Sequence, residues 1–165
     1  MSVIRVVWGS GTGPTATSAY DAALADANVH NYNLVTVSSV VPVGPAIEAV
    51  GTAPDLGPAG DRLTVVQGRA TVGPDDPGPA VAGLGWARSE SGRGILYEES
   101  GTDPEAVRTT IEDGLRRGKE LRDWSFVDGN VLVREVPASA DAYTCAVVCA
   151  VYGESTPVVA DSASF

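Results

Sequence analysis

The hydrophobic pattern of the chain is mostly that of short β-strands. Runs rich in Val, Ile, Leu and Tyr recur along the sequence, and turn-forming Gly, Pro and Asp residues separate them. The predicted strands are residues 3–8, 31–41, 62–72, 80–88, 93–99, 130–136 and 143–152. Because the strands between 62 and 99 follow one another through turn-rich connections, we expect them to pair as an antiparallel meander.

Two segments show a helical pattern instead. The first, residues 17–27, is rich in alanine and can be capped by Thr17 or Ser18. The second begins at residues 102–105, where capping residues are followed by a proline and a glutamate. Its apolar stripe consists of Val107, Ile111 and Leu115. This order of strands and helices predicts an α+β fold, in which helices pack on a largely antiparallel sheet.

Segments rich in glycine and proline predict the loops. Residues 9–13 are expected to form a flexible glycine loop whose bare backbone could bind an anion. A dinucleotide-binding fold is disfavoured because the helix is delayed past these glycines, and because residues 31–34 lack the acidic residue that such a fold needs. Residues 42–61 are expected to be an exposed excursion, and residues 153–165 a loose tail.

The composition indicates a single globular domain, residues 1–165, with enough apolar residues for a core. The formal net charge is −10 and 44% of the residues are hydrophobic. Such an acidic chain would repel nucleic acid and anionic membranes, so we expect neither as a partner. The apolar runs are too short to cross a membrane and the N-terminal residues lack a signal-peptide pattern, which predicts a cytoplasmic protein.

Cys145 and Cys149 lie four residues apart in an apolar run. On one strand their separation would be about 13 Å, which is too far for a disulfide between them. They also lack partners for a metal site, since His30 is the only histidine and there is no second pair of cysteines. We therefore expect buried, reduced, structural cysteines and no metal.

Ser38 and Ser39 interrupt the apolar strand 31–41 with two adjacent hydroxyl groups. One explanation is structural, since serines bond to nearby backbone and mark a bend where a strand ends before Pro42. The other is chemical. In a strained turn the Ser39 hydroxyl can attack the Ser38 carbonyl and convert the peptide bond to an ester. Elimination and hydrolysis would then leave an N-terminal pyruvoyl group at residue 39.

Four segments of this sequence resemble those of the pyruvoyl-dependent arginine decarboxylases. They are residues 19–24 (AYDAAL), 31–39 (NYNLVTVSS), 94–98 (GILYE) and 145–151 (CAVVCAV), in the order and separation found in that family. The resemblance implies the sandwich of sheets and helices of pyruvoyl-dependent decarboxylases. It also implies a homotrimer, or a dimer of trimers, with active sites between neighbouring protomers.

The same resemblance implies a reaction. The precursor would cleave itself between Ser38 and Ser39, giving a small chain, residues 1–38, and a pyruvoyl chain, residues 39–165. The pyruvoyl group made from Ser39 would form a Schiff base with L-arginine, and loss of CO2 would lead to agmatine for polyamine biosynthesis. The cofactor is thus part of the chain. Neither pyridoxal phosphate (PLP) nor a metal is expected.

Three further residues receive roles from the matching family motifs. Asp21 would bind the substrate guanidinium, although a carboxylate near a helix start is normally explained by the helix dipole. Asn33 would stabilise the oxyanion of self-cleavage and contact the substrate, although it could simply satisfy local backbone groups. Glu98 would supply the proton that replaces the carboxyl group. Its neighbour Glu99 would face the opposite way on a strand, as a solvated acid.

Some positions depart from the family pattern. His30 stands where glycine is common, Thr17 where an apolar residue is common, and Val43 where a second proline often occurs. These differences leave decarboxylation credible but make arginine less secure as the substrate. The alternatives are a pyruvoyl-dependent decarboxylase of another amino acid, and an unprocessed, non-enzymatic binding or assembly module.

Overall fold

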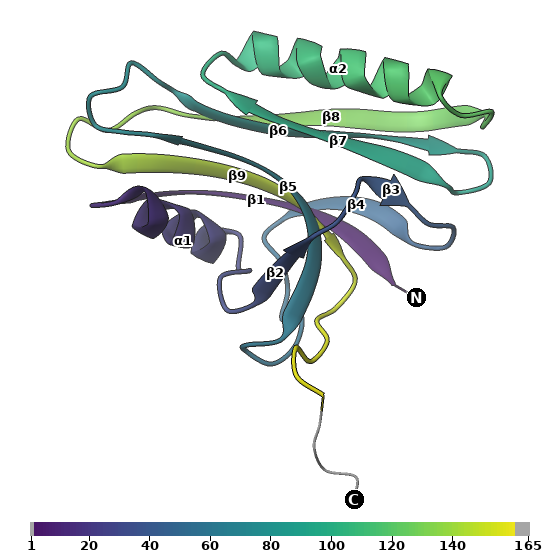
Figure 1. The fold of residues 1–165 in the computed structure, drawn as a ribbon, viewed down its shortest axis with the longest axis horizontal. Helices are drawn as coiled ribbons and strands as arrows, with labels where there is room; N and C mark the ends of the chain where they lie inside the picture. The colour runs from purple at the N-terminus through teal and green to yellow at the C-terminus, as the bar shows by residue number, and fades with distance from the viewer. Residues whose placement is uncertain (1, 161–165) are drawn as a thin grey trace, which may run out of the picture.

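The computed structural model describes residues 2–160, which form nine strands and two helices. Two sheets pack face to face, and one helix covers the outer face of each (Figure 1). The strands are β1 (Val3–Gly13), β2 (Asn33–Thr36), β3 (Val40–Val41), β4 (Ala46–Gly51), β5 (Arg62–Val72), β6 (Ala80–Ser89), β7 (Gly94–Gly101), β8 (Phe126–Val136) and β9 (Tyr143–Tyr152). The helices are α1 (Ala16–Asp26) and α2 (Pro104–Glu120). The predicted α+β sandwich is confirmed.

The two sheets differ in topology. The five-stranded sheet has the order β2-β5-β9-β1-β4, and its outer pairs, β2 with β5 and β1 with β4, are parallel. The four-stranded sheet has the order β3-β7-β6-β8 and is antiparallel throughout. The predicted meander is correct for β6 and β7 but wrong for β5, which pairs with β2 and β9. The turn-rich connection after β5 carries the chain into the other sheet.

The core lies in three apolar layers, one between the sheets and one under each helix. Strand β9 contributes to two of them. Its residues Cys145, Val147, Cys149 and Val151 face α1, while Ala146, Val148 and Ala150 face the other sheet. The two cysteines are buried and free, as predicted. Burial raises the pKa of the Cys149 thiol to about 12, which keeps it protonated and unreactive.

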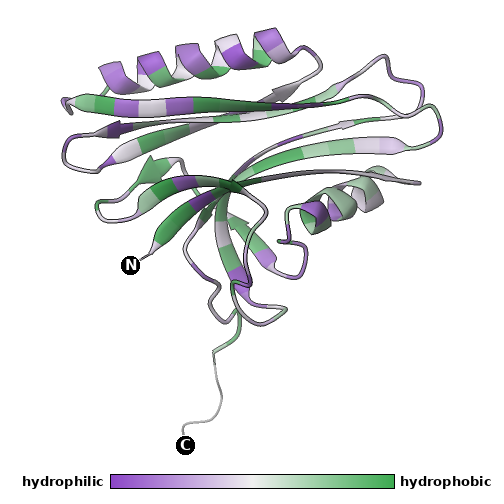
Figure 2. Cartoon of the chain, turned by 180° about the vertical axis from the view of Figure 1, so that it is seen from behind, coloured by the Kyte–Doolittle hydropathy of each residue, from purple (hydrophilic) through white to green (hydrophobic). Residues whose placement is uncertain are grey.

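Helix α2 is amphipathic and lies on the four-stranded sheet. Val107, Ile111 and Leu115 are buried against the sheet. Arg108, Glu112 and Arg116 of the same helix are exposed, and hydrophilic and hydrophobic residues alternate along its ribbon (Figure 2). The Asp103 side chain caps the helix N-terminus by accepting hydrogen bonds from the backbone of Glu105 and Ala106. The predicted packing helix is therefore confirmed.

The prediction of a flexible loop at residues 9–13 is wrong, because β1 continues through Gly13 and pairs with β9 over this length. These glycines allow helix α1 to pack closely on β1. A Cβ atom at Gly11 would lie 2.5 Å from the Cβ atom of Ala22, so only glycine lets α1 pack this closely on β1. Helix α1 also begins earlier than predicted, with Thr15 as its N-cap.

Two other loop predictions need correction. The excursion 42–61 contains β4, which extends the five-stranded sheet beside β1. The start of the predicted tail is tied to the body, since the Ser155 and Thr156 backbone amides donate to the carbonyls of Leu56 and Arg62. Residues 161–165 of that tail lie outside the described residues.

Candidate active site

The two predicted site serines lie where the chain crosses from one sheet to the other. Strand β2 is an edge strand of the five-stranded sheet, and β3 is an edge strand of the four-stranded sheet (Figure 1). On one side of the crossover, the Val37 amide donates to the carbonyl of Val65 in β5. On the other side, the Leu96 amide in β7 donates to the carbonyl of Ser39. The Ser38–Ser39 peptide bond therefore bridges the sheets.

The backbone turns tightly at Ser39. The Val40 amide donates to the Ser38 carbonyl at 2.8 Å, which closes a three-residue turn around Ser39. Ser38 is exposed and Ser39 is half-buried. This turn is the bend that the structural explanation of the two serines predicts. The same hydrogen bond aims an N–H group at the carbonyl oxygen that would become negatively charged if Ser39 attacked Ser38.

Glu98 lies beside Ser39. Strand β7 turns Ile95 toward α2 and Leu96 into the layer between the sheets, so alternation brings Glu98 to the inner face as well. The Ser39 hydroxyl donates to Glu98 Oε2 at 3.2 Å. Glu99 is engaged separately, since its carboxylate accepts from the backbone amide of Ser100. The structure therefore brings two of the predicted site residues, Ser39 and Glu98, into contact.

Tyr152, which sequence reasoning did not select, also reaches the crossover. It ends β9 in the five-stranded sheet, and its hydroxyl donates to the Val40 carbonyl at 3.0 Å. Burial raises the pKa of this hydroxyl to about 12, and the negative charge of Glu98 acts in the same direction. No local signal marks Tyr152, because its partner Val40 lies 112 residues away in the sequence.

Asp21 lies apart from this pair. It is exposed on α1, which covers the outer face of the five-stranded sheet, whereas Glu98 is on the side of β7 that faces the other sheet. The inner face of α1 is buried and consists of Ala19, Ala23 and Leu24. Within one chain, the sheet therefore separates the Asp21 carboxylate from Ser39.

The Asn33 side chain contacts the loop before β5. It is exposed at the start of β2, and its side-chain amide donates to the Gly60 carbonyl at 2.8 Å. The amide therefore has a backbone partner, but this partner lies 27 residues away in the sequence and is not the local group that the structural explanation predicts.

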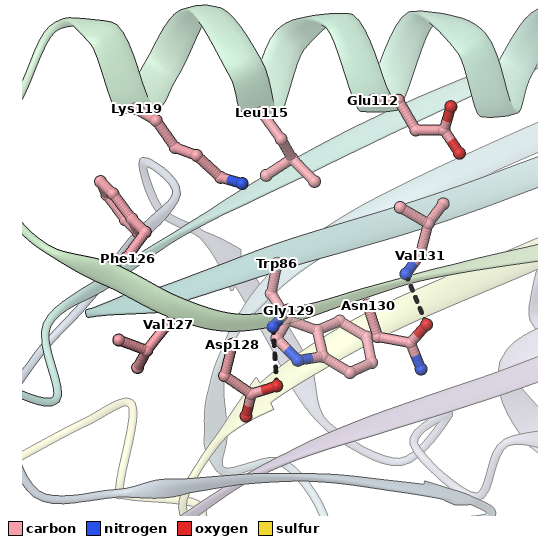
Figure 3. Close-up of a pocket in the computed structure, with 10 residues that line it drawn as sticks. All are labelled: Trp86, Glu112, Leu115, Lys119, Phe126, Val127, Asp128, Gly129, Asn130 and Val131. Carbon is pink, nitrogen blue, oxygen red and sulfur yellow. Dashed lines mark hydrogen bonds between the residues drawn. The ribbon is translucent and has the colours of Figure 1, made fainter. Parts of the chain in front are cut away.

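A surface cavity of about 520 Å³ lies elsewhere, between α2 and β8 (Figure 3). Its polar side chains include Glu112 and Lys119 from the helix and Asp128 from the strand. None of the predicted site residues lines it. Among the described residues there is no cluster of three or more His, Cys, Asp or Glu side chains that could hold a metal. No helix within residues 2–160 has the length and apolarity needed to span a membrane.

Comparison with known proteins gives a consistent result. The family model described as pyruvoyl-dependent arginine decarboxylase matches residues 3–157. A Halobacterium salinarum protein of that name is 50% identical over 160 residues, which cover 96% of this chain and 98% of the relative. Proteins of the same name from Pyrococcus horikoshii and Methanopyrus kandleri are 35% and 34% identical, over 79% and 88% of this chain and 85% and 92% of their own lengths. The chain therefore belongs to the pyruvoyl-dependent arginine decarboxylase family.

Proposed function

We propose that this protein is a self-processing decarboxylase that converts L-arginine to agmatine and CO2 with a pyruvoyl group made from Ser39. The observation that carries the proposal is the hydrogen bond from the Ser39 hydroxyl to the Glu98 carboxylate at the crossover between the sheets. A nucleophile activated by a neighbouring base is the arrangement that self-cleavage requires. Family membership supports the dependence on a pyruvoyl group.

Self-cleavage would begin at the Ser39 hydroxyl. Glu98 accepts its proton while Oγ attacks the Ser38 carbonyl carbon. The proton then passes to the nitrogen of residue 39, which leaves as an amine, and the peptide bond becomes an ester. The Val40 amide, 2.8 Å from the Ser38 oxygen, stabilises the negative charge that develops there. Elimination then releases Ser38 as a carboxylate and leaves dehydroalanine at residue 39. Addition of water and loss of ammonia produce the pyruvoyl group.

The position of the cut explains how both products could remain in place. The small chain, residues 1–38, ends after β2, which is paired with β5. The pyruvoyl chain, residues 39–165, begins just before β3, which is paired with β7. Each new end therefore keeps its own sheet partner. A cut inside either sheet would instead interrupt a strand between its hydrogen bonds.

The surroundings of residue 39 fit a pyruvoyl group, because they offer an amide for its backbone carbonyl and a carboxyl group beside its side-chain carbon. The first is the Leu96 N–H and the second is Glu98. When present, the group supplies a ketone that binds the substrate α-amine and withdraws electrons as CO2 leaves. Glu98 would hold the proton that replaces the lost carboxyl group. The reaction needs no PLP.

Substrate recognition is proposed to involve a neighbouring protomer. Asp21 suits a guanidinium because a carboxylate can accept two parallel N–H bonds from it. Asp21 lies on the far side of the five-stranded sheet from Ser39 within one chain, so it could contribute to the same reaction only if another protomer brought it to the site. This geometry supports the homotrimer, or dimer of trimers, implied by the family resemblance. We further propose a cytoplasmic location and a role of agmatine in polyamine biosynthesis.

The direct test is the mass of the purified protein. The uncut chain has a mass of 16.9 kDa, and we expect the wild type to separate into residues 1–38 and 39–165 under denaturing conditions. Ser39→Ala should abolish cleavage and activity because the nucleophile is missing. Ser38→Ala is the matched control and should still be cleaved, since Ser38 contributes only its backbone carbonyl. An active, uncut wild type would refute the proposal.

The substrate requires a separate measurement. Processed protein should release CO2 from L-arginine in preference to lysine, ornithine, histidine and neutral amino acids. Cleavage without activity on arginine, but with activity on another amino acid, would identify a different decarboxylase. Absence of cleavage together with absence of activity would favour the non-enzymatic module.

A further inference from the structure

The first residues of the proposed pyruvoyl chain are held by few interactions. Strand β3 has only two residues, Val40 and Val41, and it pairs with β7 alone. Beyond this pairing, the Leu96 amide donates to the Ser39 carbonyl at 2.8 Å. The Tyr152 hydroxyl donates to the Val40 carbonyl at 3.0 Å. The two donors belong to opposite sheets, and they hold two successive carbonyl groups.

Cleavage would increase the importance of these bonds. Before it, the chain through Ser38 ties residue 39 to β2, and the Val40 amide is bonded to the Ser38 carbonyl. Both restraints are lost when Ser38 becomes the end of a separate chain. The end of a chain frays unless it is tied down. Residue 39 would then depend on the short β3 pairing, on Leu96 and on Tyr152.

We propose that Tyr152 is a positioning residue that aligns residue 39 with Glu98 by holding the Val40 carbonyl. The inference deepens the proposed function and rests on it. Tyr152 belongs to β9 of the five-stranded sheet and Val40 to the other sheet, so their hydrogen bond spans the sandwich beside the cut. Pairing with β7 attaches the new N-terminus only to the four-stranded sheet. The Tyr152 hydrogen bond attaches it to the five-stranded sheet as well.

The environment of Tyr152 suits this role. Its ring packs against the apolar layer between the sheets, which limits the positions that the hydroxyl can take. Its raised pKa, about 12, means that the hydroxyl stays protonated and remains a donor at any pH at which the protein would work. The Val40 carbonyl needs such a donor, because β3 is an edge strand and this carbonyl points away from β7, its only strand partner.

The test compares Tyr152→Phe with wild type. The variant keeps the ring and removes only the donor. We expect complete processing, shown by intact mass, and a full yield of pyruvoyl group, shown by trapping with phenylhydrazine. The turnover number kcat should fall about fivefold, the factor expected for one hydrogen bond, while KM for arginine changes less than twofold. Exchange of the backbone amide hydrogens of Val40, Val41 and Val43 should become faster by a similar factor.

Tyr143→Phe is the matched control, since Tyr143 lies at the opposite end of β9 and faces solvent in part. It should leave exchange and kcat at wild-type values. Unchanged exchange and unchanged kcat in Tyr152→Phe would overturn the positioning role. A fall in stability with uniformly faster exchange across both sheets would also overturn it, because it would indicate a structural role alone.

The positioning role can be separated from processing. In the Ser39→Ala background, which cannot process, the Tyr152→Phe change should still accelerate amide exchange at Val40, Val41 and Val43, since the hydrogen bond exists in the uncut chain. If the wild type fails to cleave but this acceleration is seen, the proposed function fails and the anchoring contact stands. If cleavage occurs without the acceleration, the positioning role fails and the proposed function stands.

Discussion

At the scale of single residues, one carboxylate, Glu98, would serve two proton transfers in the proposed mechanism. Glu98 accepts a hydrogen bond from the Ser39 hydroxyl, so it can take the proton of the nucleophile during processing. After processing, the reactive carbon of residue 39 would occupy the same neighbourhood. The carboxyl group can then return a proton to the carbon that loses CO2. The chain would thus use one residue for its maturation and its catalysis.

Glu98→Gln tests this double use. The glutamine side chain keeps the size and an oxygen acceptor for the Ser39 hydroxyl, but it cannot take up a proton. We expect slower processing, followed by intact mass over time. Turnover per pyruvoyl group in the processed fraction should fall by about 10²–10⁴, the contribution typical of general acid catalysis.

Glu99→Gln is the matched control because it removes the same charge from the adjacent residue, whose carboxylate accepts from Ser100. It should process and turn over like wild type. Equal turnover in Glu98→Gln and Glu99→Gln would assign the proton transfer to another group.

At the scale of elements, close packing depends on glycines beneath both helices. Under α2, the Ile111 side chain fills the space above Gly83 and Gly85 of β6. A Cβ atom at these glycines would lie 2.7 and 2.6 Å from the Ile111 methyl groups. Ile111 is fully buried, and its side chain packs directly on the backbone of the two glycines, which holds α2 close to the sheet. Under α1, the glycines of β1 allow the same close approach.

Ile111→Ala should therefore destabilise the protein without changing its chemistry. Removing a fully buried isoleucine leaves a cavity and costs about 2–5 kcal/mol, measurable as a lower midpoint in urea unfolding. Helix α2 packs on the opposite side of the four-stranded sheet from Glu98, so processing at low temperature should remain complete. Thr109→Ala, at an exposed position of the same helix, should change stability by less than about 0.5 kcal/mol.

At the scale of the whole molecule, the sandwich separates residues that the family motifs assign to one reaction. Ser39 and Glu98 meet at the edge where the chain crosses between sheets, whereas Asp21 projects from α1 on the far face of the five-stranded sheet. Symmetric assembly can bring different faces of identical chains together. An active site shared between protomers would explain why one chain carries the two parts at separate places.

Complementation between two inactive variants tests the shared site. Asp21→Asn lacks the proposed guanidinium partner, and Ser39→Ala lacks the pyruvoyl group. In mixed oligomers formed by coexpression, a site that takes Ser39 from one variant and Asp21 from the other is intact. Random assembly in equal amounts should restore about a quarter of wild-type activity.

Each variant expressed alone is the control and should be inactive. Two different affinity tags purified in sequence would confirm that the oligomers are mixed. Mixed oligomers without activity would show that Asp21 does not serve the Ser39 of a neighbouring protomer.

Local signals in the sequence were enough to predict most of the secondary structure and the family. Most of the strands, both helices and the buried cysteines follow from hydrophobic periodicity, capping residues and residue chemistry, which act over a few positions. The motifs containing Ser39 and Glu98 indicated the family. These features could be predicted because each depends on neighbours along the chain.

Other features depend on contacts between distant parts of the chain, which only the tertiary structure brings together. The glycines of residues 9–13 resemble a loop until α1 is packed on them, and β4 becomes a strand because β1 offers a free edge. The contact of Ser39 with Glu98 spans 59 residues and that of Tyr152 with Val40 spans 112. Side chains so far apart meet only when two sheets stack in one register. That register is set by the packing of the entire core, and no short stretch of sequence contains it.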